Sequence, residues 1–191
     1  MGLDGQYGAP VVETKSGETD AEVSEAPVAA EGFTLDAQNS VLSGVVAADG
    51  STVLKIYFIR NQYDLTISID GVDSTVTYYY GADVAAQADP AKTGYTFIGW
   101  SEAIPATMPA TDLTITANFQ INQYTITFVD TGDVAYEAIT QDYASAIADV
   151  ADPVKTGYTF AGWDVEIPAT MPAEDLTITA KWTINQYTIT F

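Results

Sequence analysis

The sequence DPAKTGYTFIGW at residues 89–100 returns as DPVKTGYTFAGW at residues 152–163. The heptapeptide IPATMPA at residues 104–110 and the octapeptide INQYTITF at residues 121–128 return as well, and each of them is again displaced by 63 positions. A constant spacing leaves no insertion between the motifs, which is the signature of a tandem repeat. The chain therefore contains two close copies of one unit, and this repeat decides how the fold is interpreted.

The repeat predicts how the 191 residues divide into modules. We place repeat 1 at residues 61–121 and repeat 2 at residues 122–184. Residues 185–191 match the first strand of a further, incomplete repeat. Residues 1–60 are predicted to form a divergent β-rich module, in which residues 11–31 are either a linker or the first half of that module.

Polar and apolar residues alternate within each repeat. Residues 124–128 read YTITF and residues 176–180 read LTITA, with threonine at every second position. A period of two predicts half-buried β-strands, and β-branched threonine suits their exposed face. We predict a second strand at residues 75–80 of repeat 1 and at residues 134–140 of repeat 2, and a short third strand at each Gly-Tyr-Thr-Phe.

A short helix is predicted between the second and third strands. Residues 82–89 and 142–150 contain several alanines, and residues 142–150 begin with an aspartate, a combination that allows one or two helical turns. The following Asp-Pro would end such a helix. The two prolines of IPATMPA predict an extended loop. Two strands, a helical crossover and two more strands outline a β-grasp unit, so the predicted fold class is α+β and mostly β.

Aromatic residues give the candidate core and the candidate ligand surface. The tyrosine run at Tyr78, Tyr79 and Tyr80 cannot lie wholly inside, because strand alternation exposes at least one ring, and exposed rings can contact a glycan or a host protein. The aromatic residues of the two Gly-Tyr-Thr-Phe-x-Gly-Trp motifs are the predicted core anchors: Tyr95, Phe97, Trp100, Tyr158, Phe160 and Trp163.

The composition argues against catalysis and metal binding. There are 26 acidic and 6 basic residues, with no histidine and no cysteine, so the commonest general base, metal ligand and activated nucleophile are missing. We expect no catalytic residue, no cofactor and no metal, and therefore no enzyme. A net charge of −20 also disfavours nucleic acid and anionic lipid as partners.

Two further sets of polar residues are candidate sites. The carboxylates of Asp70 and Asp73, like those of Asp130 and Asp133, lie in predicted turns, but two carboxylates without calcium-loop spacing are better explained as turn formers. An asparagine recurs where each module meets the next, at positions 61, 122 and 185. A turn or a hydrogen bond between modules is the simplest role for it.

The closing strand of one repeat continues almost directly into the first strand of the next, because residues 113–128 and 176–191 contain neither glycine nor proline. Flexible linkers are rich in glycine, serine or proline, so we expect a semi-rigid, elongated array. Residues 1–10 contain neither the basic nor the apolar stretch of a signal peptide. No run reaches the ~20 apolar residues that span a bilayer, so neither a signal peptide nor an anchor is expected within this sequence.

The ordered motifs KTGYTFxGW, IPATMPA and YTITF resemble the Listeria–Bacteroides repeat, the B-repeat of internalin-type surface proteins. The resemblance covers residues 61–184, while residues 32–60 are weakly similar to a mucin-binding-protein-like repeat. It implies a ubiquitin-like β-grasp fold, in which the first and last strands pair in parallel, and tandem copies in bacterial surface proteins. It also implies a structural, spacing role in a cell-surface adhesin, whose direct partners are the neighbouring repeats. The alternative is a module that binds a host protein or a glycan through exposed aromatic residues.

Overall fold

A computed structural model describes residues 1–191 in full and contains β-strands and no helix. The contacts divide the chain into two compact units. The first comprises Met1–Ala88 and Trp100–Ala117, and the second comprises Asp89–Gly99 and Asn118–Phe191. The dominance of β-structure agrees with the sequence, but the predicted α+β class is wrong.

Short antiparallel pairs make up the amino-terminal module. Strand β1 (Glu22–Ser24) pairs with β3 (Ser43–Val45), and β2 (Phe33–Leu35) pairs with β4 (Phe58–Arg60). The register of the second pair places Phe33 opposite Arg60. This β2–β4 pair is the part of the module that leads into repeat 1.

Repeat 1 forms a four-stranded sheet in the order β6-β5-β8-β7. Strand β5 (Gln62–Ile69) pairs antiparallel with β6 (Val72–Tyr79) and parallel with β8 (Leu113–Ile121), while β7 (Tyr95–Trp100) follows β8 in the order. Leu65 lies opposite Leu113 in the parallel register. The first and last strands of the repeat are therefore neighbours, as the family resemblance implies.

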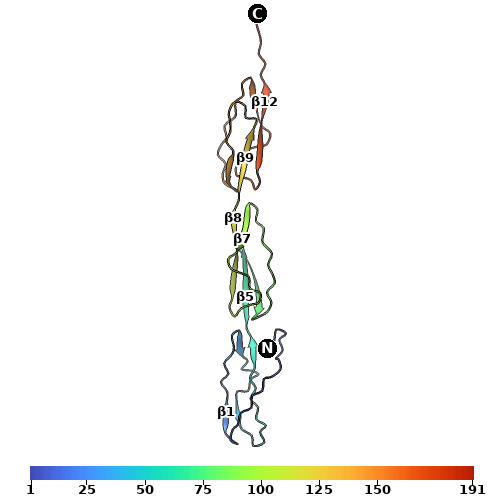
Figure 1. Cartoon of the computed structure of the whole chain (residues 1–191), viewed down its shortest axis with the longest axis vertical. Coiled ribbons are helices and arrows are strands. Elements are labelled where there is room, and N and C mark those ends of the chain that lie inside the picture. Colours follow the sequence, from blue (N-terminus) through green and yellow to red (C-terminus); the bar gives the residue numbers. More distant parts are fainter. The chain divides into compact units, whose positions relative to one another are not determined.

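Repeat 2 has the same order, β10-β9-β12-β11, with β9 (Gln123–Val129), β10 (Ile139–Asp142), β11 (Tyr158–Trp163) and β12 (Leu176–Ile184). Strands β9 and β12 run side by side and parallel (Figure 1). The second strand was predicted at residues 134–140, but β10 begins only at Ile139, and residues 134–138 are not part of any strand. Tyr136 packs there on Phe128 and Trp163, and its hydroxyl donates to the Ala151 carbonyl at 2.8 Å.

The predicted helices are absent, and with them the helix that defines a β-grasp unit. Residues 82–89 and 142–150 contain no helical residue and bond to the IPATMPA loops instead. The Val84 N–H donates to the Ala106 carbonyl at 3.0 Å, and the Met108 N–H donates to the Ala82 carbonyl at 2.9 Å. Repeat 2 has the equivalent pair of bonds, and Ala144 takes a φ of +59°, which a right-handed helix does not allow. Pairing with the proline-rich loop thus satisfies the backbone that a helix would have satisfied internally.

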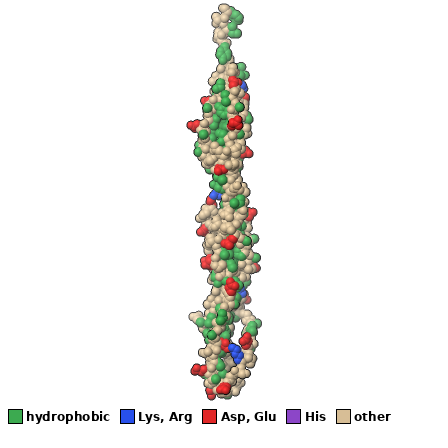
Figure 2. All heavy atoms as spheres, turned by 60° about the vertical axis from the view of Figure 1, so that its left-hand side comes forward, with side chains coloured by type: hydrophobic (Ala, Val, Ile, Leu, Met, Phe, Trp, Pro, Cys, Tyr) green, Lys and Arg blue, Asp and Glu red, His purple; other side chains and the backbone are tan.

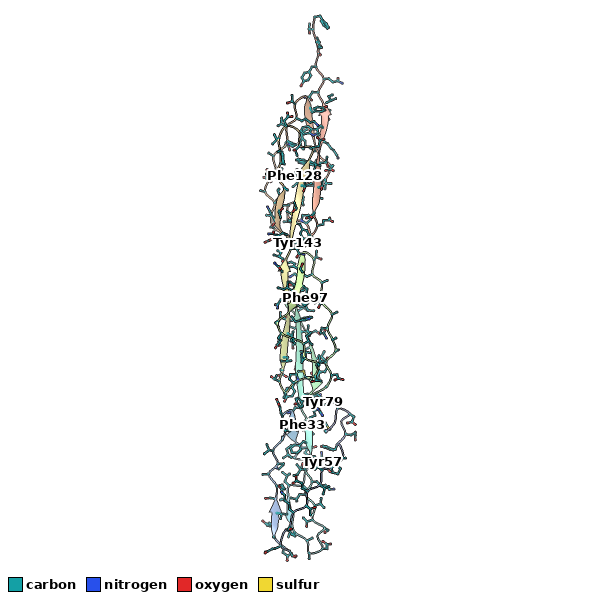
Figure 3. The ribbon with its side chains drawn as sticks, viewed as in Figure 1. Phe33, Tyr57, Tyr79, Phe97, Phe128 and Tyr143 are labelled. Carbon is teal, nitrogen blue, oxygen red and sulfur yellow. The ribbon has the colours of Figure 1, made fainter.

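Each repeat has a small apolar core built around a methionine of that loop. Met108 and Met171 are both 1% exposed. Their neighbours come from the central parallel strands, in one repeat Leu65, Ile67 and Ile115, and in the other Ile126, Phe128 and Ile178. Phe128 lies among the strands of its sheet (Figure 3). The two prolines hold the loop extended, so that the methionine side chain covers one face of the sheet.

Met171→Ala should destabilise repeat 2 by about 2–5 kcal/mol, because it leaves a cavity in a core of few residues. Met171→Leu, which nearly conserves volume, should lose less than about 1.5 kcal/mol. Urea unfolding monitored by tryptophan fluorescence measures both variants. Equal losses for the two substitutions would contradict the packing role of the methionine.

Candidate functional site

Three clusters with the same residue types lie where one module meets the next sequence unit. The first cluster is centred on Asn61, between β4 and β5. The Asn61 N–H donates to the Gly32 carbonyl at 2.9 Å, and its carbonyl accepts the Tyr80 N–H at 2.8 Å. Its side-chain oxygen accepts the Thr34 hydroxyl at 2.7 Å, and its Nδ2 lies 3.4 Å from the Tyr63 hydroxyl. One asparagine thus joins the β2–β4 pair of the amino-terminal module to β5 and to the end of β6.

The second cluster, centred on Asn122 between β8 and β9, repeats these contacts. The Asn122 N–H donates to the Gly94 carbonyl at 2.9 Å, and its carbonyl accepts the Tyr143 N–H at 2.8 Å. Its side-chain oxygen accepts the Thr96 hydroxyl at 2.7 Å, and its Nδ2 lies 3.4 Å from the Tyr124 hydroxyl. The predicted inter-module hydrogen bond of the recurring asparagine is present in both clusters.

A tyrosine ring lies directly on the glycine in each of these two clusters. Gly32 and Gly94 have φ of +75° and +76°, and a Cβ built on them would stand 2.2 Å from Tyr80 and 2.1 Å from Tyr143. The ring also meets the aromatic residue after the glycine edge-on, since the Tyr95 and Tyr143 centroids are 6.2 Å apart at 78°. The glycine is needed for its left-handed backbone and for the close approach of the ring.

The third cluster is centred on Asn185, which directly follows β12. The Asn185 N–H donates to the Gly157 carbonyl at 2.9 Å, and its side-chain oxygen accepts the Thr159 hydroxyl at 2.6 Å. Gly157 has a φ of +81°, but nothing lies within 4 Å of the position that its Cβ would take. The asparagine contacts are thus formed without a tyrosine on the glycine.

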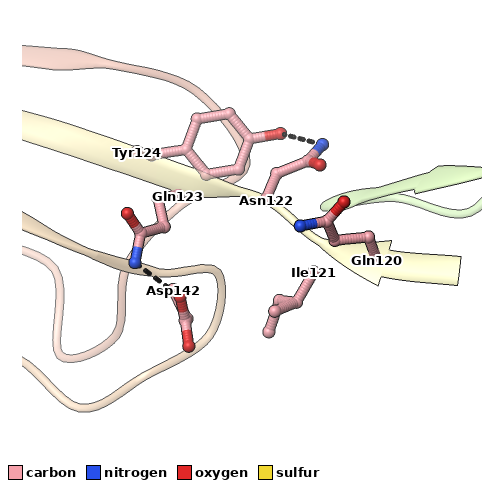
Figure 4. A pocket seen from close by; sticks show the side chains of 6 residues that line it. All are labelled: Gln120, Ile121, Asn122, Gln123, Tyr124 and Asp142. Carbon is pink, nitrogen blue, oxygen red and sulfur yellow. Dashed lines mark hydrogen bonds between the residues drawn. The ribbon is translucent and has the colours of Figure 1, made fainter.

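An open depression lies beside the second cluster, lined by residues 120–124 and Asp142 (Figure 4). The Gln123 side-chain amide donates to the Asp142 carboxylate across it at 3.0 Å. Amides and a single carboxylate offer hydrogen bonds but no nucleophile paired with a base. No group of three acidic side chains in the structure is placed to hold a metal ion.

The tyrosine run is half-buried throughout and divides between two environments. Tyr78 packs against the core of repeat 1, and Tyr80 lies on Gly32 and meets Phe33 edge-on at 5.9 Å. Tyr79, labelled in Figure 3, stands opposite Gln62 in the ladder. The rings proposed for ligand contact therefore include one ring of the core and one ring of a junction cluster.

The six predicted core anchors are also divided. Only Trp100 and Trp163 pack against the buried clusters, and each is half-buried. Tyr95 meets Tyr143, and Phe97 meets Phe119 at 5.8 Å. In repeat 2, Phe160 lies between Trp163 and Trp182, while Tyr158 is 38% exposed beneath the Lys155 ammonium. Sequence reasoning missed the two methionines, since a proline-rich loop gives no periodic signal.

The aspartates of the predicted turns form a turn or contact other residues of the chain. Asp70 and Gly71, with φ of +52° and +77°, form the two-residue hairpin turn between β5 and β6. Asp130 lies 3.2 Å from the Lys155 ammonium, and Asp133 accepts both the N–H and the hydroxyl of Thr156 at 2.7 and 2.6 Å. Asp70 therefore forms a turn as predicted, whereas Asp130 and Asp133 contact residues more than 20 positions away in the sequence.

In each repeat, the polar side chain that directly follows the third strand accepts a backbone N–H of the closing strand. In repeat 1 the Ser101 hydroxyl accepts the Thr116 N–H at 2.9 Å. In repeat 2 the Asp164 carboxylate accepts the Thr179 N–H at 2.6 Å and the Val165 N–H at 2.9 Å. Because these backbone donors favour the charged form, the Thr179 bond above all, the pKa of Asp164 is lowered from its ordinary value of 3.8.

Comparison with known proteins gives the family. The profile of the Listeria–Bacteroides repeat domain matches residues 56–121 and 124–181. The chain therefore belongs to the Listeria–Bacteroides repeat family. The weaker resemblance of residues 32–60 to a mucin-binding-protein-like repeat stays a prediction.

Individual relatives agree with this assignment. Internalin H of Listeria monocytogenes is 34% identical over 145 residues, which cover 66% of this chain and 26% of that protein. Two proteins of Evansella cellulosilytica, a putative Gly-rich membrane protein and a putative membrane protein, are each 26% identical, over 84% and 69% of this chain. The chain spans about a quarter of the length of these relatives. It is thus similar to repeat segments of internalin-like and membrane proteins, although its own structure contains no helix able to cross a membrane.

The lowered pKa of Asp164 predicts a pH dependence. A carboxylate with a lowered folded-state pKa stabilises the fold above the unfolded value and loses this effect as pH falls through the folded value. The stability advantage of the wild type over Asp164→Ser should therefore shrink between pH 5 and pH 2. Serine is the replacement because Ser101 accepts the equivalent N–H in repeat 1. Urea unfolding across this range measures it. Asp149→Ser, which removes a charge from an exposed position, is the control, and an identical pH profile for both variants would contradict the role of Asp164.

The glycine–tyrosine contact predicts a second difference. Gly94→Ala and Gly157→Ala both force alanine into a left-handed backbone, at about 1–2 kcal/mol, but only Gly94→Ala also displaces a ring. We expect Gly94→Ala to destabilise by about 1–3 kcal/mol more than Gly157→Ala. Combining Gly94→Ala with Tyr143→Ala should remove part of this excess, which a double-mutant cycle by urea unfolding detects. Equal losses at the two glycines would exclude a structural role for the contact.

Proposed function

We propose that the chain is a non-enzymatic spacer that transmits tension through an extracellular protein of the bacterial cell surface. The single observation that carries the proposal is the parallel pairing of the first and last strands of a repeat. In repeat 2, Ile126 to Val129 of β9 lie opposite Leu176 to Thr179 of β12. The repeat therefore begins at one end of this ladder and ends at the other.

Tension along the chain would act on this ladder in shear. A pull on the start of β9 and on the end of β12 drives the two strands past each other, so all hydrogen bonds of the pair bear force together. The strands also carry the buried Ile126, Phe128 and Ile178, so sliding would break the core contacts in the same step. This arrangement supports a mechanical role.

The junction clusters support the same role, because they place hydrogen bonds where a flexible linker would otherwise lie. The asparagine at positions 61 and 122 bonds to residues on both sides of it.

Acidic side chains are scattered over the visible surface and basic ones are few (Figure 2). A net charge of −20 keeps neighbouring copies apart in solution. The family and its internalin-type and membrane-protein relatives are the basis for placing the chain at the cell surface.

Single-molecule stretching tests the mechanical role. The chain has no native cysteine, so pairs of introduced cysteines can choose the direction of force. Gln123→Cys with Ile184→Cys loads the β9–β12 pair in shear, and Val129→Cys with Lys181→Cys peels the same pair from one end; all four positions are exposed. We expect the shear pair to unfold repeat 2 at a clearly higher force.

The peeling pair is the matched control, because it unfolds the same repeat with the same number of substitutions. Circular dichroism and urea unfolding should show equal equilibrium stability for the two pairs before they are stretched. Equal unfolding forces in the two directions, or a weaker shear direction, would contradict the proposed transmission of tension.

A further inference from the structure

The third junction cluster lacks one part that the other two contain. Gly32 and Gly94 are buried beneath Tyr80 and Tyr143, whereas Gly157 is only partly buried and has open space above it. The aromatic residue after the glycine is also more exposed in the third cluster than in the second. Tyr158 is 38% exposed, while Tyr95 is half-buried against Tyr143.

The rest of this third cluster already has the geometry of the filled ones. The Asn185 N–H is 2.9 Å from the Gly157 carbonyl, the same distance that the first and second clusters show for their own asparagines. The hydroxyl bond from Thr159 measures 2.6 Å, against 2.7 Å in both filled clusters. The φ of Gly157 is within a few degrees of the other two. A surface that is preformed in this way loses little conformational freedom when its partner binds.

We propose that Gly157, Tyr158, Thr159 and Asn185 form a docking socket for one tyrosine of a further Listeria–Bacteroides repeat that directly follows Ile184. The tyrosine is the residue that comes immediately after the second strand of that repeat, as Tyr80 comes after β6 and Tyr143 after β10. Its ring lies on Gly157 and meets Tyr158 edge-on, and its N–H donates to the Asn185 carbonyl.

Continuity with the established clusters identifies the occupant. The residues Asn185, Gln186 and Tyr187 repeat the sequence of Asn122, Gln123 and Tyr124, which lead into the strands that deliver Tyr143. A bare glycine with a positive φ accepts the face of a ring at a distance that any Cβ would block. The tyrosine supplies this ring together with the backbone donor.

The inference uses the junction chemistry of the proposed function, but it can be tested without force. The test protein carries a second copy of residues 61–121 directly after Ile184, which leaves the segment 152–163 unique for hydrogen-exchange mass spectrometry. In the appended copy only, Tyr80 is kept, changed to Phe or changed to Ala. With Tyr or Phe, exchange in residues 157–160 should be about threefold to tenfold slower than with Ala, the range expected for one aromatic contact.

Tyr143→Ala in the original 191-residue chain, where residues 94–97 occur only once, is the standard, and it should accelerate exchange in those residues by a similar factor. Peptides that span the substituted position 80 are unique to the appended copy, and protection of β6 in these peptides shows that the Tyr80→Ala copy is folded. Equal exchange in residues 157–160 for all three appended copies, while Tyr143→Ala does accelerate residues 94–97, overturns the socket. No effect of Tyr143→Ala overturns it as well, because the filled cluster would then not depend on its ring. A correct socket with equal shear and peeling forces would refute the mechanical role alone.

Discussion

Parallel pairing between the first and last strands is the constraint on which the rest of each repeat depends. Parallel strands cannot be joined by a tight turn and require a long crossover. In repeat 2 the chain between β9 and β12 has to supply both edge strands and a cover for one face of the sheet. It does so with β10, β11 and the extended segments that bond to each other through Ile147 and Ala169. Met171 is carried by that cover, and it closes a core that no disulfide supports, since the chain has no cysteine.

The same pairing explains why the junction clusters are placed where they are. The last strand ends beside the start of the third strand, since Ile184 lies opposite Tyr158 in the antiparallel ladder. The asparagine that follows extends this ladder by one bond to the glycine carbonyl. Because the next repeat begins at the same asparagine, its carbonyl and side chain are available to both sides. One residue type at one position thus ends one sheet and begins another.

Much of the fold could be predicted from the sequence because strand alternation is a local signal. The threonine-rich runs at residues 124–128 and 176–180 became central strands, and the recurring asparagine was correctly expected to bond between modules. The helix at residues 142–150 was wrong, because its alanines satisfy their backbone against a proline-rich loop some 20 residues away, which no local pattern reveals. Tyr80 was interpreted as a candidate ligand contact because no local pattern reveals its partner in the fold either. Its partner Gly32 lies far away in sequence, and a positive φ cannot be read from a glycine alone.

The differences between the two repeats separate what the fold tolerates from what it requires. Repeat 1 turns from β5 into β6 with two residues, whereas repeat 2 uses a longer loop whose Tyr136 packs on Phe128. Ser101 after β7 corresponds to Asp164 after β11, and either side-chain oxygen accepts the equivalent backbone donor. The glycine, threonine and asparagine of the junctions are instead the same residue types in all three clusters, including the divergent amino-terminal module. The turn after the first strand and the residue after the third strand can therefore vary because each serves only its own sheet, while a junction has to fit two sheets at once and allows far fewer solutions.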